Sequence, residues 1–334
     1  MDYKIAQKLD FTVVIPNLNS MMTIKDTLDS ASKAARAYDS NLIEIVLVDN
    51  GSCDGSLRII EAWLKSNPDI KLKLIQEPCP GNPGLARNVG LLNSESQNIL
   101  FLDSDDCLHA DVFAILNANI NKDTDLIIFN YEVRQSSLTP PHRKNRNLTS
   151  YGKSKLELLS QYVTLGMDNS VIATCFSKKL LLSHTKIFFD KGIYEDIYYL
   201  AQALLKARKI QILDLELYIK NEVLESVSNS LTRDHIYFYL KAWKTCQSLI
   251  SQNLSYSLTS RHIDKSIRGV IGQMVVKINR SNLSEAEKEK MRVYLANCIQ
   301  EFYPKVERYF LSTEDTLLDK YAINFVKCYN KVYG

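Results

Sequence analysis

Short apolar runs rich in β-branched residues alternate with helical patterns through the first 131 residues of this 334-residue chain. This alternation is typical of βαβ units, in which helices connect neighbouring parallel strands. Two of the runs are almost uniformly apolar, as expected of strands that are covered on both faces. The predicted strands are 11–15, 43–48, 70–75, 98–102 and 125–129, and the predicted helices between them are 23–38, 56–65 and 84–92. The sequence therefore predicts an α/β fold with a largely parallel sheet.

The pattern changes after the fifth predicted strand. Residues 135–150 are polar and contain two consecutive prolines, which indicates a loop. Helical periodicity continues from about residue 231 almost to the end of the chain. The elements expected in between are helices at 153–167 and 194–207 and a strand-like run at 213–219. We therefore predict an α/β domain over residues 1–230 and a helical C-terminal region over residues 231–334.

Cellular location is constrained by what the sequence lacks. No apolar run approaches the roughly 20 residues that a membrane-spanning helix needs. The first ten residues have neither the basic start nor the apolar core of a signal peptide. The seven cysteines are scattered singly, without the spacing of a zinc site or a disulfide framework. These features predict a cytoplasmic protein.

Charge is distributed unevenly along the chain. Of the 41 Lys and Arg and the 38 Asp and Glu residues, the region 231–334 holds 16 and 10, so this region is basic. A basic helical region suits an anionic membrane surface, an acidic partner or a lipid diphosphate. A solvated bundle that packs on the first domain or forms a homo-oligomer explains the same charges. The basic residues form no motif with aromatic residues, so we expect no nucleic-acid partner.

Polar residues follow the predicted strands at their carboxyl ends, where open parallel sheets bind ligands. The first strand ends in Ile15-Pro16-Asn17-Leu18-Asn19, and the second continues from Val48 to Gly55. By itself, Asp49 at the tip of the second strand is more typical of a turn or a helix cap than of a ligand-binding residue. The third stretch, Gly81 to Gly90, holds several glycines and Arg87, which suit phosphate oxygens or a plain glycine-rich turn.

The fourth stretch carries the strongest chemical signal. The apolar run Ile99 to Leu102 leads directly into Asp103-Ser104-Asp105-Asp106. Three carboxylates within four residues repel one another unless a cation or hydrogen-bond donors compensate. Mg²⁺ and Mn²⁺ prefer carboxylate oxygens and leave positions open for water and substrate phosphates. A helix cap near Asp111 explains one of these acids but not three, so we predict a divalent cation site that neutralises a diphosphate.

Together the four stretches resemble the family-2 inverting glycosyltransferases of the GT-A fold, of the type that makes bacterial surface polysaccharides. The family pattern comprises I-P-x-x-N, V-D-(D/N)-G-S-x-D-G, a segment ending A-R-N-x-G, and F-L-D-x-D-D. These motifs stand here in that order at 15–19, 48–55, 86–90 and 101–106. Asn50 occupies a position where a second Asp is commoner. The match is close through the five predicted strands and looser from there to residue 230.

The resemblance implies a GT-A catalytic domain over residues 1–230 that transfers a sugar from a UDP-sugar to a glycan or a lipid-linked oligosaccharide. The enzyme would be a hexosyl- or N-acetylhexosaminyltransferase, with Mn²⁺ or Mg²⁺ on the leaving diphosphate. The residues it assigns to donor binding are Pro16, Asn19, Asp49, Arg87, Asp103 and Ser104. Asp49 would contact uracil, Arg87 the diphosphate or base, and Asp103 the ribose or sugar. Asp105 would ligate the metal.

The resemblance also assigns roles on the acceptor side. Glu195 and Asp196, at the head of the helix expected at 194–207, occupy the place of the acidic pair of the family. Asp196 would be the base that takes the acceptor hydroxyl proton, and Glu195 would support it. By themselves, two acids at a helix N-terminus are a common surface feature. His235 follows the Ser-rich segment 225–230, which corresponds to a loop over the donor, and would complete the metal shell or touch a phosphate; a lone histidine is more often structural.

Two other functions remain open at this point. A sugar nucleotidyltransferase would carry a glycine-rich loop with Lys or Arg directly after the first strand, and residues 15–19 have neither. A non-catalytic scaffold for polysaccharide assembly, with a vestigial donor site, would not need the costly carboxylates at 103, 105 and 196. The residues therefore favour the transferase.

Overall fold

The structure is a computed structural model, and it describes residues 9–77, 82–135, 142–143, 148, 154–183, 186–190, 192–222, 231–253, 256–304 and 320–326. Three features of the sequence fall outside these residues. They are Gly81 in the third polar stretch, most of the loop expected at 135–150, and the Ser-rich segment 225–230.

Two compact units share the chain, and they are interleaved along the sequence. The first comprises Met1–Ser150, Ser170–Lys191 and Lys206–Val223. The second comprises Tyr151–Asn169, Gly192–Leu205 and Leu224–Gly334. The first unit carries the sheet, and the described elements of the second are helices. The predicted functional division into 1–230 and 231–334 stays a prediction.

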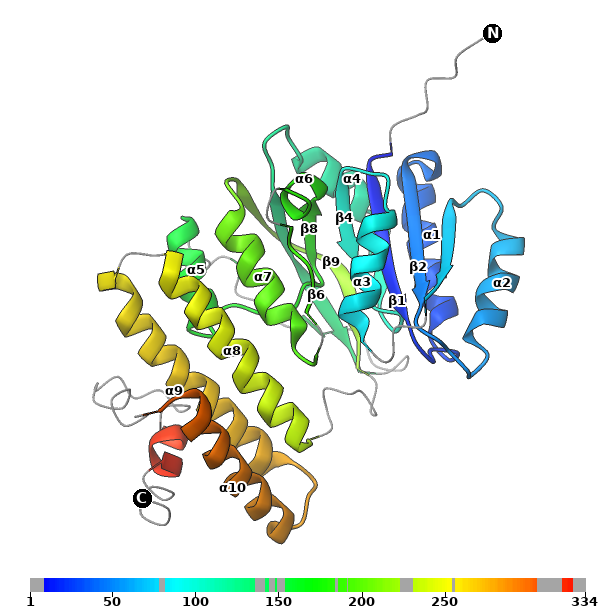
Figure 1. The fold of residues 1–334 in the computed structure, drawn as a ribbon. Helices are drawn as coiled ribbons and strands as arrows, with labels where there is room; N and C mark the ends of the chain where they lie inside the picture. Colours follow the sequence, from blue (N-terminus) through cyan, green and yellow to red (C-terminus); the bar gives the residue numbers. More distant parts are fainter. Residues whose placement is uncertain are drawn as a thin grey trace. The chain divides into compact units, whose positions relative to one another are not determined.

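A nine-stranded sheet is the framework of the first unit (Figure 1). Its strands are β1 (Phe11–Asn17), β2 (Ile43–Asp49), β3 (Leu72–Gln76), β4 (Asn98–Phe101), β5 (Cys107–Leu108), β6 (Leu126–Arg134), β7 (His142–Arg143), β8 (Thr174–Ser177) and β9 (Ile210–Asn221). Their spatial order is β3-β2-β1-β4-β8-β6-β9-β5, and β7 pairs with β6. All five predicted strands are present, and the α/β fold is confirmed.

Parallel pairing dominates the part of the sheet that was predicted, and antiparallel pairing enters beyond it. β3, β2, β1 and β4 are parallel neighbours, and β9 is parallel to β6. β8 lies between β4 and β6 and is antiparallel to both. Sequence reasoning missed β8, although the apolar run at 171–176 is a signal for it. The strand-like run at 213–219 is part of β9.

Helices surround this sheet and make up the described elements of the second unit. The first unit holds α1 (Ile24–Tyr38), the 3-10 helix η1 (Ser40–Leu42), α2 (Ser56–Ser66), α3 (Pro83–Asn93), α4 (Val112–Asn119) and α6 (Lys178–Leu181). The second holds α5 (Lys155–Val163), α7 (Glu195–Lys206), α8 (Arg233–Asn253), α9 (Tyr256–Arg280) and α10 (Glu285–Phe302). Among the described residues, no helix combines the length and apolar character of a membrane span. The five cysteines described there are free thiols.

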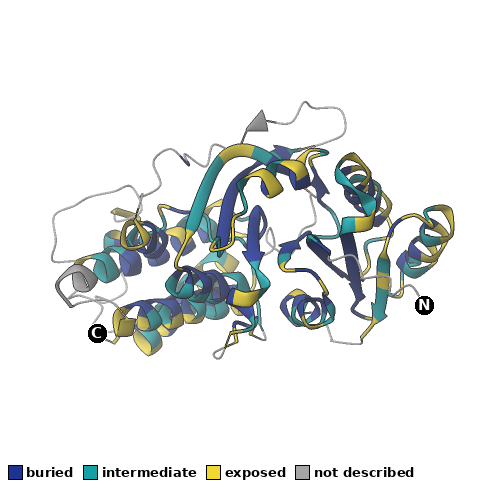
Figure 2. Cartoon of the chain, turned by 90° about the horizontal axis from the view of Figure 1, so that it is seen from above, coloured by how far each residue is buried: buried dark blue, intermediate teal, exposed yellow. Residues whose placement is uncertain are grey.

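The two faces of the parallel strands pack against different helices. Ile45 and Leu47 of β2 belong to the main core, together with side chains of α1, α2 and α4. Val46 and Val48 point the other way and pack with Ala86 of α3. Successive strand residues point to opposite faces, so a strand with helices on both faces is apolar throughout. Figure 2 shows β1, β2 and β4 as mostly buried and the helices with exposed outer faces.

Close contact between α3 and β1 depends on a glycine. A Cβ atom at Gly90 would lie 2.3 Å from Cγ1 of Val14, so any side chain there forces the helix away from the strand. We expect Gly90→Ala to lower the free energy of unfolding by about 1–3 kcal/mol, although alanine is the better helix former. Urea unfolding followed by Trp63 emission, in a Trp243→Phe background that leaves one tryptophan, measures this in the first unit.

Val14→Ala provides the matched control, because it removes the closest atom that the new Cβ meets. In that background the destabilisation caused by Gly90→Ala should shrink, which a double-mutant cycle quantifies. Strictly additive effects of the two substitutions would contradict the steric explanation.

Candidate functional site

The carboxyl ends of β1, β2 and β4 lie side by side because these strands are parallel neighbours. Asn17 pairs with Asp49 at the ends of β1 and β2, and Val14 pairs with Phe101 near the end of β4. The loops that follow these strands therefore leave the sheet at the same edge. The predicted residues gathered in this unit are Pro16, Asn19, Asp49, Arg87, Asp103, Ser104 and Asp105.

Asp49 organises the turn that follows β2. Its Oδ1 accepts hydrogen bonds from Asn17 Nδ2 at 2.6 Å and from Ser52 Oγ at 2.6 Å. Its Oδ2 accepts from the backbone N–H groups of Gly51 at 3.2 Å and Ser52 at 3.0 Å. Only 2% of Asp49 is exposed, and both oxygens are engaged within the protein. This geometry matches the turn residue that the sequence also allowed, and the contact of Asp49 with uracil stays a prediction.

Asn19 ties the loop after β1 to the loop after β2. Its backbone has φ +50°, in the left-handed region where asparagine is enriched. Its N–H donates to Ser52 Oγ at 2.9 Å, and its Oδ1 accepts from the N–H of Cys53 at 2.9 Å. Pro16 lies beyond the last pair between β1 and β4, so its missing N–H costs no hydrogen bond to β4. Both residues shape the predicted donor edge.

The loop Asp103–Asp106 after β4 is anchored first by α1. The carbonyl oxygen of Ser104 accepts from Thr23 Oγ1 at 2.9 Å and from Thr27 Oγ1 at 3.0 Å. Within the loop, the N–H of Asp106 donates to the carbonyl oxygen of Asp103 at 3.1 Å and closes a tight turn. Sequence reasoning missed the two threonines, because Thr23 at the N-cap and Thr27 in α1 are ordinary residues for the start of a helix. Ser104 therefore contributes its backbone to the shape of the loop.

The same loop is anchored on its other side by β9. Asp106 is buried, and its Oδ2 and Oδ1 accept from Tyr218 Oη at 2.7 Å and from the N–H of Asn221 at 2.8 Å. The Tyr218 hydroxyl also accepts from the N–H of Asp103 at 3.2 Å. Asn221 Nδ2 donates to the carbonyl oxygen of Asp105 at 2.6 Å. Both carboxylate oxygens of Asp106 are therefore committed to side chains and backbone of β9.

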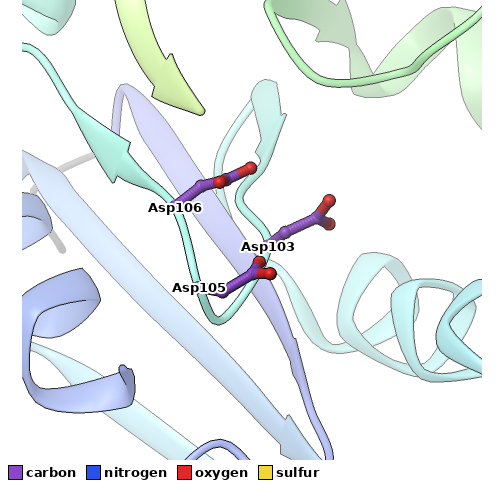
Figure 3. Close-up of side chains that lie close together, drawn as sticks. All are labelled: Asp103, Asp105 and Asp106. Atoms are coloured by element: carbon purple, nitrogen blue, oxygen red, sulfur yellow. The ribbon is translucent and has the colours of Figure 1, made fainter. Parts of the chain in front are cut away.

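The three acids of the loop form a cluster that is suited to a divalent cation. Asp103, Asp105 and Asp106 each bring an oxygen to within 4.8 Å of the others (Figure 3). Burial and then the charge of Asp103 raise the pKa of Asp105 to about 6. Burial and then the charges of the other two acids raise the pKa of Asp106 well above its ordinary value. All donors are hard oxygens, which fit Mg²⁺ or Mn²⁺.

Arg87 of α3 acts on Asp103. Its Nη2 lies 2.7 Å from Oδ1 of Asp103, and its guanidinium lies 5.3 Å from the ring centroid of Phe189. Phe189 is fixed in turn by Asn88, whose side-chain amide exchanges two hydrogen bonds of 2.9 Å with its backbone. Arg87 is almost fully buried. The predicted contact of Arg87 with the diphosphate or base stays a prediction, and the observed contact orients a carboxylate of the acid cluster.

Glu195 and Asp196 open α7 in the second unit. Tyr194, directly before them, has φ +68°, which is unusual for a bulky side chain. Its hydroxyl accepts from Lys277 Nζ of α9 at 3.2 Å, and its ring stands edge-on to that of Tyr239 of α8 at 5.0 Å. The head of α7 is therefore held by side chains of α8 and α9. The predicted catalytic roles of the acidic pair stay predictions.

His235 lies in the first turn of α8, also in the second unit. It is buried, its Nδ1 is hydrogen-bonded to Thr232 Oγ1 at 2.8 Å, and its ring stands edge-on to Tyr194 at 6.2 Å. These contacts fit the structural role that is common for a lone histidine. Its predicted place in the metal shell stays a prediction.

Comparison with known sequences gives the family. The profile of glycosyl transferase family 2 matches residues 12–181. A cholesterol galactosyltransferase of Borreliella burgdorferi is 28% identical over 244 residues, which are 69% of this chain and 65% of that protein. TarS of Staphylococcus aureus, a poly(ribitol-phosphate) beta-N-acetylglucosaminyltransferase, is 28% identical over 217 residues, 63% of this chain and 35% of TarS. The matches thus span less than two thirds of these relatives.

Comparison with solved structures gives the same fold. Residues 1–349 of Staphylococcus aureus TarS in complex with UDP match with a TM-score of 0.67 at 22% identity, covering 97% of this chain and 90% of that one. A mannosyltransferase of Pyrobaculum calidifontis in complex with GDP-Man and Mn²⁺ matches with a TM-score of 0.55 at 12% identity, covering 98% and 88%. At these identities the likeness establishes the fold.

Proposed function

Because this chain belongs to glycosyl transferase family 2, we propose that it is an inverting glycosyltransferase that moves a sugar from a UDP-sugar to a glycan or a lipid-linked saccharide. The observation that carries the proposal is the acid loop 103–106, which stands beside the polar ends of β1 and β2. The relatives named above are galactosyl- and N-acetylglucosaminyltransferases, which supports a hexosyl- or N-acetylhexosaminyl group as the cargo.

UDP is the proposed nucleotide of the donor. The TarS structures that hold UDP and UDP-GlcNAc share this fold, with TM-scores of 0.67 and 0.55. The loops after β1 and β2, tied together through Asn19 and Asp49, provide the edge at which the base and ribose would bind. Ligands of open α/β sheets bind at this edge, outside the carboxyl ends of the strands.

The acid cluster fits the divalent ion that this reaction would use. Asp105 and Asp103 would hold Mn²⁺ or Mg²⁺, and Arg87 keeps Asp103 in its orientation. When bound, such an ion supplies positive charge that stabilises the diphosphate as it leaves. The Mn²⁺ in the mannosyltransferase structure supports this choice of ion.

Asp196 is the proposed base, with Glu195 assisting. The acceptor hydroxyl would give its proton to the Asp196 carboxylate while its oxygen attacks the anomeric carbon. The bond to the diphosphate breaks on the opposite face, so an α-linked donor gives a β-linked product. Both acids lie in the first turn of α7, where the helix dipole suits negative charge.

A thermal-shift screen tests the donor site. UDP, GDP, CDP and dTDP are each compared with and without Mn²⁺, because a ligand that binds only the folded state raises the apparent melting temperature. We expect the largest rise with UDP and Mn²⁺ together, and its loss on addition of EDTA. A larger rise with GDP would contradict UDP as the donor nucleotide. No rise with any nucleotide would contradict the donor site, and release of UDP from UDP-sugars would distinguish an enzyme from a binding scaffold.

Contact of the basic region 231–334 with a membrane surface and its self-association also stay proposals. Flotation with anionic and neutral vesicles tests the first, and light scattering after size exclusion tests the second. The cytoplasmic location stays a prediction, and flotation with the anionic vesicles alone would support a place at the inner face of the membrane.

A further inference from the structure

We propose that Tyr218 and Asn221 of β9 are positioning residues that hold the carboxylates of Asp103 and Asp105 at the spacing a divalent ion needs. They act through Asp106, whose carboxylate ties the loop to β9 and is not itself a ligand of the ion. This inference rests on the proposed function, because it concerns the ion that would stabilise the leaving diphosphate.

The Tyr218 hydroxyl joins two parts of the acid loop. A tyrosine hydroxyl has one proton to donate and lone pairs that accept. Its proton goes to Asp106 Oδ2 at 2.7 Å, and a lone pair accepts the N–H of Asp103 at 3.2 Å. The side chain of Tyr218 is buried, so no water replaces either bond if the hydroxyl is removed. One atom therefore fixes both the start and the end of the loop.

Asn221 holds the acid loop at a second position, three residues further along β9. Its side-chain amide donates to the carbonyl oxygen of Asp105 at 2.6 Å, and its N–H donates to Asp106 Oδ1 at 2.8 Å. The two residues reach the loop because β5, which follows it directly, pairs with β9, with Leu108 opposite Tyr218. The register of that pairing sets where the loop is held.

The contacts that Tyr218 and Asn221 make with the acid loop suit a cation site. Asp106 is held by a hydroxyl and a backbone N–H, which bring no positive charge into the loop. The same contacts oppose the mutual repulsion that would otherwise spread the three carboxylates. Asn221 donates to the backbone carbonyl oxygen of Asp105 and not to its carboxylate. The carboxylate oxygens of Asp105 are therefore left to the cluster.

The effect of removing such a contact is large for metal sites. Residues that orient ligands by hydrogen bonds typically change metal affinity about 10- to 100-fold when they are replaced. We expect Tyr218→Phe to raise the Kd for Mn²⁺ by about that factor. Since the ligands themselves remain, saturating Mn²⁺ should return kcat toward the value of the parent protein.

The experiment is a Mn²⁺ titration of the full chain, with free Mn²⁺ measured by its electron paramagnetic resonance signal, with and without UDP. Tyr38→Phe is the matched control: it removes another hydroxyl that donates to a carboxylate, Asp10 Oδ2 at 2.6 Å, in the same unit and at the opposite edge of the sheet. The control should bind Mn²⁺ as the parent does. Equal Kd values for Tyr218→Phe and the parent would overturn the inference.

Two further variants keep the test decisive if Tyr218→Phe does not fold. Asn221→Ala removes the bond to the carbonyl oxygen of Asp105 and a weak contact of 3.9 Å with Cys107 Sγ, and it keeps the backbone N–H for Asp106. It should also weaken Mn²⁺ binding. Asp106→Asn should weaken Mn²⁺ binding to the same extent as the Tyr218 and Asn221 variants. Complete loss of Mn²⁺ binding, as expected for a ligand, would contradict a purely positioning role of Asp106. A parent protein that binds no Mn²⁺ even with UDP would instead contradict the proposed function.

Discussion

Asp105→Asn is expected to lower the rate of sugar transfer about a thousandfold at saturating UDP-sugar and Mn²⁺. The ion contributes several kcal/mol to the stabilisation of the leaving diphosphate, and each 1.36 kcal/mol changes a rate about tenfold. Asparagine keeps the volume of the side chain and the backbone contact of Asp105 with Asn221, so the loop should stay in place. Release of UDP from the UDP-sugar measures the rate. Transfer at an unchanged rate would remove Asp105 from the metal site.

Without metal, Asp105→Asn should make the protein more stable, although it lowers the rate of transfer. The pKa of Asp105 is raised to about 6 by burial and the charge of Asp103, above its ordinary 3.8. Stability present below pH 3.8 is therefore lost as the pH rises through about 6, because the buried group must ionise. At pH 8 the asparagine variant avoids this cost, which is about 3 kcal/mol. In EDTA the melting temperature of the variant should lie above that of the parent at pH 8 and close to it at pH 4. A lower melting temperature of the variant at pH 8 would contradict the repulsion between the carboxylates of the loop.

Asp196→Asn is expected to lower transfer by about 10² to 10⁴ while leaving the donor site intact. Asparagine can still accept a hydrogen bond from the acceptor hydroxyl but cannot take its proton at neutral pH. The measurement is the initial rate of product formation beside the thermal shift given by UDP and Mn²⁺, which should not change. Glu195→Gln should reduce the rate less, because Glu195 assists and does not take the proton.

Asp264→Asn is the matched control for this prediction, since it neutralises another partly buried acid of the second unit, on α9. Its transfer rate should equal that of the parent. If Asp196→Asn also transfers at the parent rate, the two acids at the head of α7 serve only the helix terminus, as their position in the sequence alone allowed.

Local pattern was sufficient to predict a cluster of acids directly after a strand, because these acids lie within one segment. Asp103 and Asp105 follow a buried strand, and the order of parallel strands implies that they lie near Asn17 and Asp49. The role of Asp49 was less predictable: one Asp at a strand tip suits a ligand or a turn, and only the hydrogen bonds show the turn.

Contacts between distant segments could not be predicted in this way. Tyr218 and Asp106 are separated by 112 residues, and their contact depends on the register of β5 with β9. A two-residue strand such as β5 carries no periodicity from which that register follows. Arg87 reaches Asp103 only through the rotation of α3 on the sheet, which the spacing A-R-N-x-G does not specify.

The interleaving of the two units bears on how the chain is made. Its path passes between the units five times, so neither unit is complete until late in synthesis. β6 ends at Arg134, whereas β9, which pairs along one of its edges, ends at Asn221. At typical translation rates this delay lasts roughly 4 to 17 s. During that time a nascent chain presents an apolar strand with a bare edge, which is the situation in which ribosome-associated chaperones prevent aggregation.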